Sequence, residues 1–405
     1  MTKMFQVPQI HPIHPFPARM APSIVWDNLP DSRKPLRILD PMAGSGTSLV
    51  IAKARGHQAI GCDTDPLAVM IAHAWCSNVS SCRLSQRARS ILDEAVEIAK
   101  DLPIEKAYPS QADDETKQFI DFWFDDSSRV QLTALSSCIT RISNPDERNL
   151  LWSAFSRLII TKKKGVSLAM DVSHSRPHRK YERAPVRPFD KFLDAVEYII
   201  KKAPFRDGDF QFPPAIVTKG DARLLPFDSN SFDLVITSPP YLNAIDYIRG
   251  HKLSLVWMGY SVRSLRTVRS SNIGAERSIY KDVASELLNV LSQMGDVERL
   301  DIRHQSMITR YLNDISYVLL ECRRVLKNNG RATFVIGDSA IRGVYIKNSD
   351  AMIRLAQKRG FELVSRINRL LPESRRYLPP PNSNKAGPQM QNRMREEVIL
   401  QFIAI

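Results

Sequence analysis

The residues best suited to do chemistry are Thr237-Ser238-Pro239-Pro240-Tyr241, which follow an apolar run ending at Ile236. Both prolines lack a backbone N–H and have a fixed φ, so the chain can neither continue a strand nor easily begin a helix there. The resulting rigid corner brings together a hydroxyl, backbone carbonyls and an aromatic ring. It suits a flat base with an exocyclic amino group, because the oxygens accept its N–H bonds and the ring stacks on it. Taken alone, the motif has an equally good structural explanation, in which a strand simply ends in a proline turn and Tyr241 packs in the core.

A second candidate site lies upstream. Residues 37–40 form an apolar segment, which is followed by Pro41-Met42-Ala43-Gly44-Ser45-Gly46-Thr47-Ser48 and a helical run at 49–54. A strand, a glycine turn and a helix in this order present free helix N–H groups to an anion or a carboxylate. The glycines allow positive φ and a close approach of a ligand to the backbone. The third glycine and a Gly-Lys-Ser/Thr sequence are missing, so neither a full dinucleotide fingerprint nor a phosphate loop fits.

The next predicted strand, at residues 58–63, ends in an acid. Asp63 is placed there to accept hydrogen bonds from ribose hydroxyls. Asp65 precedes Pro66, which is typical of a helix cap, so we assign Asp65 a structural role. An ordinary βαβ unit with an acidic cap is the alternative interpretation of this region.

Together, these motifs resemble those of the S-adenosylmethionine-dependent amino-methyltransferases, which modify exocyclic nitrogens of DNA bases. The resemblance implies that residues 40–47 bind the methionine part of the cofactor and that Asp63 holds its ribose. It also implies that Gly220-Asp221-Ala222-Arg223 flanks the adenine, with Asp221 as the acid, and that residues 14–20 close over the methionine. The cofactor-binding residues implied in this way are Phe16, Pro17, Asp40, Met42, Gly44, Gly46, Thr47, Asp63, Asp221 and Ala222. The implied catalytic residues are Ser238, Pro239, Pro240 and Tyr241.

Within that family, Ser238 before the two prolines and the stretch at 242–260 are similar to the cytosine-N4 branch. The resemblance therefore implies methylation of cytosine N4 in a flipped-out base, in the context of DNA methylation and restriction-modification. The alternatives are adenine-N6 methylation of DNA, methylation of an RNA base, and a non-catalytic DNA-binding subunit. Asn243 and Asp246 either contact the base or cap the next helix.

The charge of the chain favours a polyanionic partner. Its 405 residues carry a formal net charge of +14 and give a pI near 9.6, from which we expect a nucleic-acid partner, with solubility alone as the alternative. The resemblance to DNA amino-methyltransferases implies that this partner is double-stranded DNA. Two basic stretches are candidate phosphate contacts. For the first stretch the alternative is a solvated linker, and for the second it is a solvated helix face. The candidate DNA-binding residues are Lys163, Arg176, Arg179, Lys180, Arg263, Arg266 and Arg269.

The five cysteines form no C-x-x-C pair and their number is odd, so we expect reduced thiols in the cytoplasm rather than disulfides or a zinc site. His174 and His178 have helical spacing, but Pro177 breaks that helix, and we expect no metal. No stretch resembles a signal peptide or a membrane-spanning helix, so we expect no membrane partner.

Strands alternate with helices along much of the chain. This pattern predicts an α/β protein with a Rossmann-like, doubly wound sheet, whose ligand crevice lies at the carboxyl ends of the strands. Helical periodicity from about residue 84 to 203 predicts an inserted, mostly helical subdomain. We therefore divide the chain into a catalytic domain, 1–77 and 216–405, and a helical insertion, 78–215, that contacts the DNA target. A helix is predicted to stop at Asn329-Gly330, before a strand at 331–338, and a loop at 375–384 is expected to face the substrate. The other predicted strands are 37–40, 58–63, 216–217, 232–236, 361–367 and 397–403.

Overall fold

The computed structural model describes residues 10–17, 19–208, 212–242, 246–274, 285–371 and 396–405. Three parts of the sequence predictions lie outside these residues: Asn243, the loop at 375–384 and Ala18 in the segment at 14–20. No helix in the described ranges is long and apolar enough to cross a membrane.

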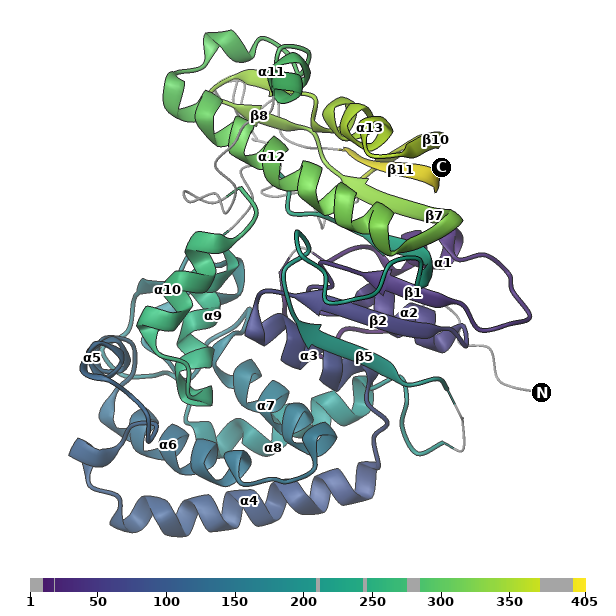
Figure 1. The fold of residues 1–405 in the computed structure, drawn as a ribbon. Helices are drawn as coiled ribbons and strands as arrows, with labels where there is room; N and C mark the ends of the chain where they lie inside the picture. The colour runs from purple at the N-terminus through teal and green to yellow at the C-terminus, as the bar shows by residue number, and fades with distance from the viewer. Residues whose placement is uncertain (1–9, 18, 209–211, 243–245, 275–284, 372–395) are drawn as a thin grey trace.

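A seven-stranded mixed sheet forms the centre of the protein, in the order β10-β11-β7-β6-β1-β2-β5 (Figure 1). β5, β2, β1, β6 and β7 are parallel, whereas β11 is antiparallel to both β7 and β10. The predicted α/β class is confirmed. The strands are β1 (Arg37–Asp40), β2 (Gln58–Asp63), β5 (Ala215–Lys219), β6 (Phe232–Thr237), β7 (Leu326–Ile336), β10 (Phe361–Leu370) and β11 (Glu396–Ala404).

The strand order reverses at β1. This strand lies between β2 and β6, with Asp40 opposite Gly61 on one side and Leu39 opposite Val235 on the other. In parallel sheets, ligands bind where the order reverses, outside the carboxyl ends of the strands. The glycine turn after β1 and the proline corner after β6 both begin at that position.

Helices cover both faces of the sheet, as a doubly wound fold requires. Ile38 of β1 packs with the helices of one face and Leu39 with those of the other, because successive side chains of a strand point to opposite sides. The first face carries α1 (Pro22–Asn28), α2 (Thr47–Ala54) and α3 (Pro66–Cys76). The second carries α11 (Ser285–Leu291), α12 (Ile302–Val325) and α13 (Asn348–Lys358).

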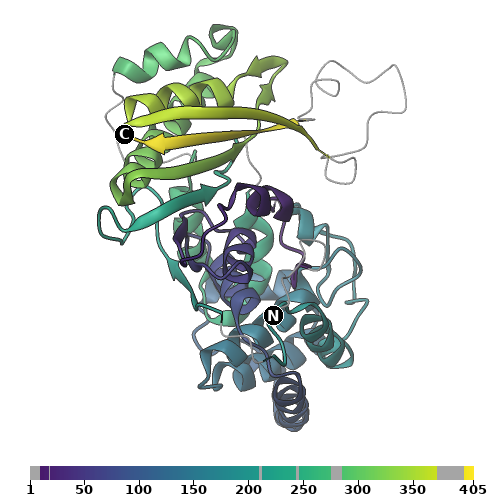
Figure 2. The same ribbon diagram turned by 90° about the vertical axis from the view of Figure 1, so that its right-hand side faces the viewer.

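The segment between α3 and β5 is mostly helical, as expected, and Figure 2 shows its blue and teal helices below the sheet. Its apolar side chains form one continuous cluster with those of α2 and α3, so the insertion and the sheet share a core. The division of the chain at 77 and 216 stays a prediction. The elements are α4 (Ser81–Asp101), η2 (Ile104–Lys106), α5 (Asp114–Trp123), α6 (Asp126–Thr140), α7 (Pro145–Ile159), β3 (Ala169–Met170), η3 (Val172–His174), β4 (His178–Arg179) and α8 (Pro188–Lys202).

Short helices follow β6, and a small hairpin follows β7. α9 begins soon after the proline corner and packs against α3, α7 and η3, while the basic helix α10 packs against α9 and α5. Between β7 and α13, the antiparallel strands β8 and β9 form a hairpin. The bounds are α9 (Tyr247–Leu255), η4 (Val256–Met258), α10 (Val262–Ser271), η5 (Val297–Arg299), β8 (Ser339–Ile341) and β9 (Val344–Ile346).

The prediction that a helix stops at Asn329-Gly330 is wrong. α12 ends at Val325, and β7 begins at once. Leu326 pairs with Phe232 on β6 before the register shifts, and Asn329 has a φ of 62°. The Asn-Gly pair therefore lies in a bulged part of β7, because pairing with β6 outweighs the local tendency to end a helix.

Candidate active site

Asp40, the last residue of β1, fixes the glycine turn to the proline corner. Its buried carboxylate accepts hydrogen bonds from the Thr237 hydroxyl at 2.6 Å, from the Met42 N–H at 3.1 Å and from the Ser48 hydroxyl. Burial raises the pKa of Asp40 to about 6, and the three hydrogen bonds oppose that rise. The two motifs that the sequence places far apart are thus joined by one carboxylate.

The glycine turn has the backbone shape that its sequence predicts. Gly44 and Gly46 have φ values of 50° and 88°. A Cβ on Gly46 would lie 2.8 Å from the Cβ of Ala72 on α3, so a side chain cannot fit there. Gly46 caps α2 without any side-chain acceptor, and the first N–H groups of that helix have no partner within it. The buried Ser45 hydroxyl also lacks a hydrogen-bond partner among the described residues.

Asp63 connects the end of β2 to the same turn. Its carboxylate accepts the N–H of Gly44 at 2.8 Å and the N–H of Asp65 at 2.9 Å. Burial is the main cause that raises the pKa of Asp63 to about 7, and the charge of Asp65 adds to it. Each carboxylate oxygen keeps a lone pair, so Asp63 can still accept hydrogen bonds from a ligand.

Asp221 follows β5 and is held by its neighbour. Both of its oxygens accept hydrogen bonds from the Arg223 guanidinium, at 3.0 and 2.7 Å. The buried Arg223 also donates to Asp314 at 2.8 Å. The Gly220 N–H donates to the Asp63 carbonyl at 3.0 Å, which keeps this loop beside the end of β2. Ala222 is buried in the core on the α12 side of the sheet.

The proline corner faces the glycine turn. The Ser238 hydroxyl donates to the Val335 carbonyl of β7 at 3.0 Å, and Pro239 is buried. Tyr241 is partly buried against the α12 side of the core, and burial raises the pKa of its phenol to about 12. A small cavity of about 40 Å³ separates the corner from the turn. Its lining residues are Arg19, Met20, Asp40, Met42, Ala43, Gly44, Ser45, Thr47, Ser48 and Ser238.

Residues 14–17, 19 and 20 close the third side of this site. The buried Phe16 ring lies 3.7 Å from the position of a Cβ on Gly44, and Pro17 is half-buried. The Arg19 guanidinium donates to the His14 carbonyl at 3.1 Å. His251 of α9 contacts Phe16 and pairs with Asp65. His251 lies within the stretch at 242–260 but is not among the predicted site residues, because nothing in its local sequence marks it out.

The predicted DNA-binding residues are all exposed, and they lie in the segment at 161–181, where Arg179 belongs to β4, and on α10. α5 lies between the two groups: the Arg179 guanidinium sits over the Phe122 ring at 5.4 Å, and Arg266 pairs with Glu115. Arg269 pairs with Asp246 at 2.6 Å. Among the described residues, no ion pair engages Lys163, Arg176, Lys180 or Arg263.

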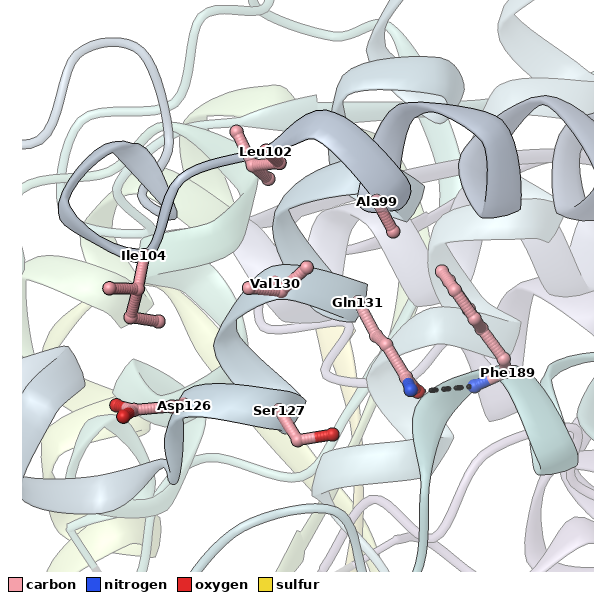
Figure 3. A pocket seen from close by; sticks show the side chains of 8 residues that line it. All are labelled: Ala99, Leu102, Ile104, Asp126, Ser127, Val130, Gln131 and Phe189. Atoms are coloured by element: carbon pink, nitrogen blue, oxygen red, sulfur yellow. Dashed lines mark hydrogen bonds between the residues drawn. The ribbon is translucent and has the colours of Figure 1, made fainter.

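A larger hollow of about 350 Å³ lies elsewhere, between α4, α6 and the start of α8 (Figure 3). There the Gln131 amide oxygen accepts the Phe189 N–H at 3.1 Å. None of the predicted site residues lines this hollow. Within the described ranges, no group of three or more His, Cys, Asp or Glu side chains is arranged to hold a metal ion. All five cysteines are free thiols.

No family model matches the chain, whereas individual known proteins do. The chain is 25% identical over 425 residues to the Type II methyltransferase M.MvaI of Kocuria varians, covering 96% of this chain and 90% of that protein. The chain is similar to the Type II methyltransferases. It is also 24% identical over 373 residues to M.AvaI of Anabaena variabilis, covering 81% of this chain and 73% of that protein. Among solved structures, it matches a TehB-like SAM-dependent methyltransferase from Corynebacterium glutamicum at a TM-score of 0.30 and 11% identity, covering 95% of this chain and 87% of that one.

Proposed function

We propose that this protein is a DNA methyltransferase that transfers a methyl group from S-adenosylmethionine to the exocyclic N4 of cytosine. The observation that carries the proposal is the buried contact of Thr237 with Asp40, which sets Ser238 and the glycine turn around one cavity. The similarity to Type II methyltransferases over nearly the whole chain supports the reaction class.

The residues of the turn fit S-adenosylmethionine. The free N–H groups at the start of α2 and the unpaired Ser45 hydroxyl are donors for its carboxylate. Asp63 accepts from the ribose hydroxyls, and the loop of Asp221 and Ala222 flanks the adenine. When bound, the cofactor supplies an electrophilic methyl group on a sulfonium. Phe16 and Pro17 cover the methionine end.

Ser238 is prepared to act as an acceptor. Its proton is already donated to the Val335 carbonyl, so the remaining lone pairs of its oxygen can accept an N–H of the base. The Pro239 carbonyl accepts the second N–H. The two bonds would draw the nitrogen lone pair out of conjugation and make the nitrogen more nucleophilic. No strong base is needed first, because the N–H proton leaves only after the new N–C bond has formed. Alignment can supply about 7–11 kcal/mol of barrier reduction.

The base has to leave the duplex to reach this corner. Flipping costs a few kcal/mol, and stacking on the Tyr241 ring returns about 1–3 kcal/mol of it. The net charge of +14 and the exposed arginines and lysines beside α5 suit the phosphates of double-stranded DNA. We assign DNA contact to the insertion at 78–215 and to α10, and the five free thiols suit the cytoplasm.

The decisive experiment is methyl transfer from labelled S-adenosylmethionine to duplex DNA and to tRNA, followed by mass spectrometry of the nucleosides. We expect N4-methylcytosine in the DNA. N6-methyladenine would replace the proposed base, and label in tRNA alone would move the activity to RNA. If there is no transfer and calorimetry detects no binding of S-adenosylmethionine, the protein is a non-catalytic subunit.

Two substitutions test the assigned roles. Tyr241→Ala should weaken capture of the base and leave cofactor affinity nearly unchanged, because its ring stacks on the base. Asp63→Ala should do the opposite, because its carboxylate binds the ribose. Cofactor titration by calorimetry and DNA titration by fluorescence anisotropy separate the two effects. Equal losses of cofactor affinity in both variants would contradict these roles.

A further inference from the structure

A buried pair of side chains outside the predicted motifs lies behind the segment at 14–20. His251 on α9 is 1% exposed, and its Nδ1 lies 2.5 Å from Oδ2 of Asp65. At this distance from a carboxylate, Nδ1 carries the proton and donates it. A hydrogen bond to a charged acceptor is stronger than one between neutral groups, and a buried one fixes the orientation of the ring.

The fixed imidazole ring supports Phe16. The centroids of the His251 and Phe16 rings are 5.0 Å apart, and the Tyr247 ring lies 6.0 Å from Phe16. Tyr247 and His251 are one turn apart on α9, so both rings reach the same side of Phe16. Phe16 also contacts the glycine turn, since its ring lies 3.7 Å from the position of a Cβ on Gly44. The Phe16 ring therefore contacts both α9 and the glycine turn.

The other partner of the pair belongs to the cofactor side. Oδ1 of Asp65 accepts the Leu67 N–H at 2.9 Å and caps α3, while its own N–H donates to Asp63. Asp63 in turn accepts from Gly44. These contacts form a closed cycle, which runs from Gly44 through Asp63, Asp65, His251 and Phe16 back to Gly44. Asp65 thus has a second role beside the cap that its sequence context predicts.

The beginning of the same segment is anchored separately. Nε2 of the buried His14 lies 3.0 Å from the Ser156 hydroxyl on α7, and its carbonyl accepts from Arg19. These contacts fix residue 14 but do not touch the Phe16 ring. The position of that ring depends on α9, which starts soon after Tyr241 of the proline corner.

We propose that His251, held by Asp65, is a positioning residue that sets how tightly Phe16 closes over bound S-adenosylmethionine. The inference rests on the proposed function. It gives α9 two roles, since the helix that follows the base-binding corner also supports the wall of the cofactor site.

Two conservative substitutions test it. His251→Phe keeps an aromatic ring but loses the hydrogen bond, and Asp65→Asn keeps a good helix cap but removes the charge. In each variant we expect the dissociation constant of S-adenosylhomocysteine to rise about tenfold. Calorimetry at about pH 8.5 measures it, because Asp63 is ionised there with or without the charge of Asp65. The KM for S-adenosylmethionine should rise in parallel, while kcat at saturating cofactor stays within about twofold of wild type. The double variant should lose no more than either single variant, because both break the same contact.

The chain offers a matched control pair. Asp301 caps α12 by accepting the His304 N–H at 2.9 Å, and the Nδ1 of His304 lies 2.7 Å from the same oxygen. This pair has the same chemistry but lies at the start of α12, and Asp301 is exposed. Asp301→Asn and His304→Phe should leave the affinity for S-adenosylhomocysteine unchanged.

The outcomes are distinct. If His251→Phe and Asp65→Asn lower the melting temperature or kcat but leave affinity and KM at wild-type values, the pair is merely structural and the inference fails. If the control variants weaken binding as much as the test variants, the inference also fails. If the wild-type protein binds neither S-adenosylmethionine nor S-adenosylhomocysteine, the proposed function fails, and this inference with it.

Discussion

The site at the ends of β1 and β6 and the basic surface beside α5 are built in different ways. At the first, Asp40 is buried and its partners are hydroxyl and N–H groups, so the arrangement exists before any ligand arrives. At the second, Arg266 and Arg269 are exposed and paired with carboxylates of the same chain. Exposed pairs contribute about 0–1 kcal/mol and exchange partners readily. The candidate site is thus held in place by buried contacts, whereas the side chains of the basic surface are free to change partners.

The largest expected effect is at the preformed site. Ser238→Ala removes the proposed acceptor for the amino group of the base. We expect kcat to fall about 10²–10³-fold, the size of loss seen when an enzyme loses one preorganised hydrogen bond of its active site. Affinity for S-adenosylhomocysteine should not change. Ser231→Ala is the control, because that exposed hydroxyl donates only to the Asp228 carbonyl near the start of β6. A Ser238→Ala variant with wild-type kcat would remove Ser238 from the mechanism.

The next prediction tests the link between the two motifs. Thr237→Val keeps the shape of the side chain but leaves Asp40 without one donor, so the corner loses its fixed position relative to the turn. We expect kcat to fall about tenfold and the free energy of unfolding to fall by about 1–3 kcal/mol. Thr237→Ser retains the hydroxyl and should recover most of both, as measured by steady-state kinetics and urea denaturation. Failure of serine to restore kcat would argue against this hydrogen bond.

Cofactor affinity should depend on pH through Asp63. Its pKa in the free protein is raised to about 7, and ribose hydroxyls bind the ionised form, so binding releases the proton. Affinity for S-adenosylhomocysteine should therefore be constant well above pH 7 and fall as the pH drops below it, approaching about tenfold per pH unit. Calorimetry from pH 5.5 to about 8.5 measures this. Asp63→Asn, which cannot titrate at this position, should bind weakly with a profile that is flat above the pKa of Asp40, about 6. A slope near pH 7 in that variant would assign the proton to another group.

The smallest effects are expected on the basic surface. Arg263→Ala removes a charge for which the described residues show no ion pair, so the slope of log affinity for duplex DNA against log salt should decrease by about 1. Arg266→Ala should change the slope less, because Glu115 already neutralises that charge. Glu115→Gln should strengthen DNA binding slightly. If all three variants keep the wild-type slope, α10 does not contact DNA.

Much of the fold could be predicted because it depends on local patterns. Apolar runs between glycine, proline and acidic residues gave the strands, and the structure confirms them at the sheet centre. The exception is Asn329-Gly330, where a strong local stop signal lies inside β7. Pairing between strands that are distant in sequence decided that segment, and no local pattern encodes such pairing.

The site shows the same division. Residue types and spacing alone determined that a glycine turn, strand-end acids and a proline corner exist, because each depends on a few neighbouring residues with special backbone freedom. The tertiary structure decided which groups meet: Thr237 with Asp40, Asp65 with His251, and Arg266 with Glu115. Each of these contacts joins residues that are far apart along the chain. Their meeting depends on strand order and helix packing, which arise from burial of the whole core rather than from any single segment.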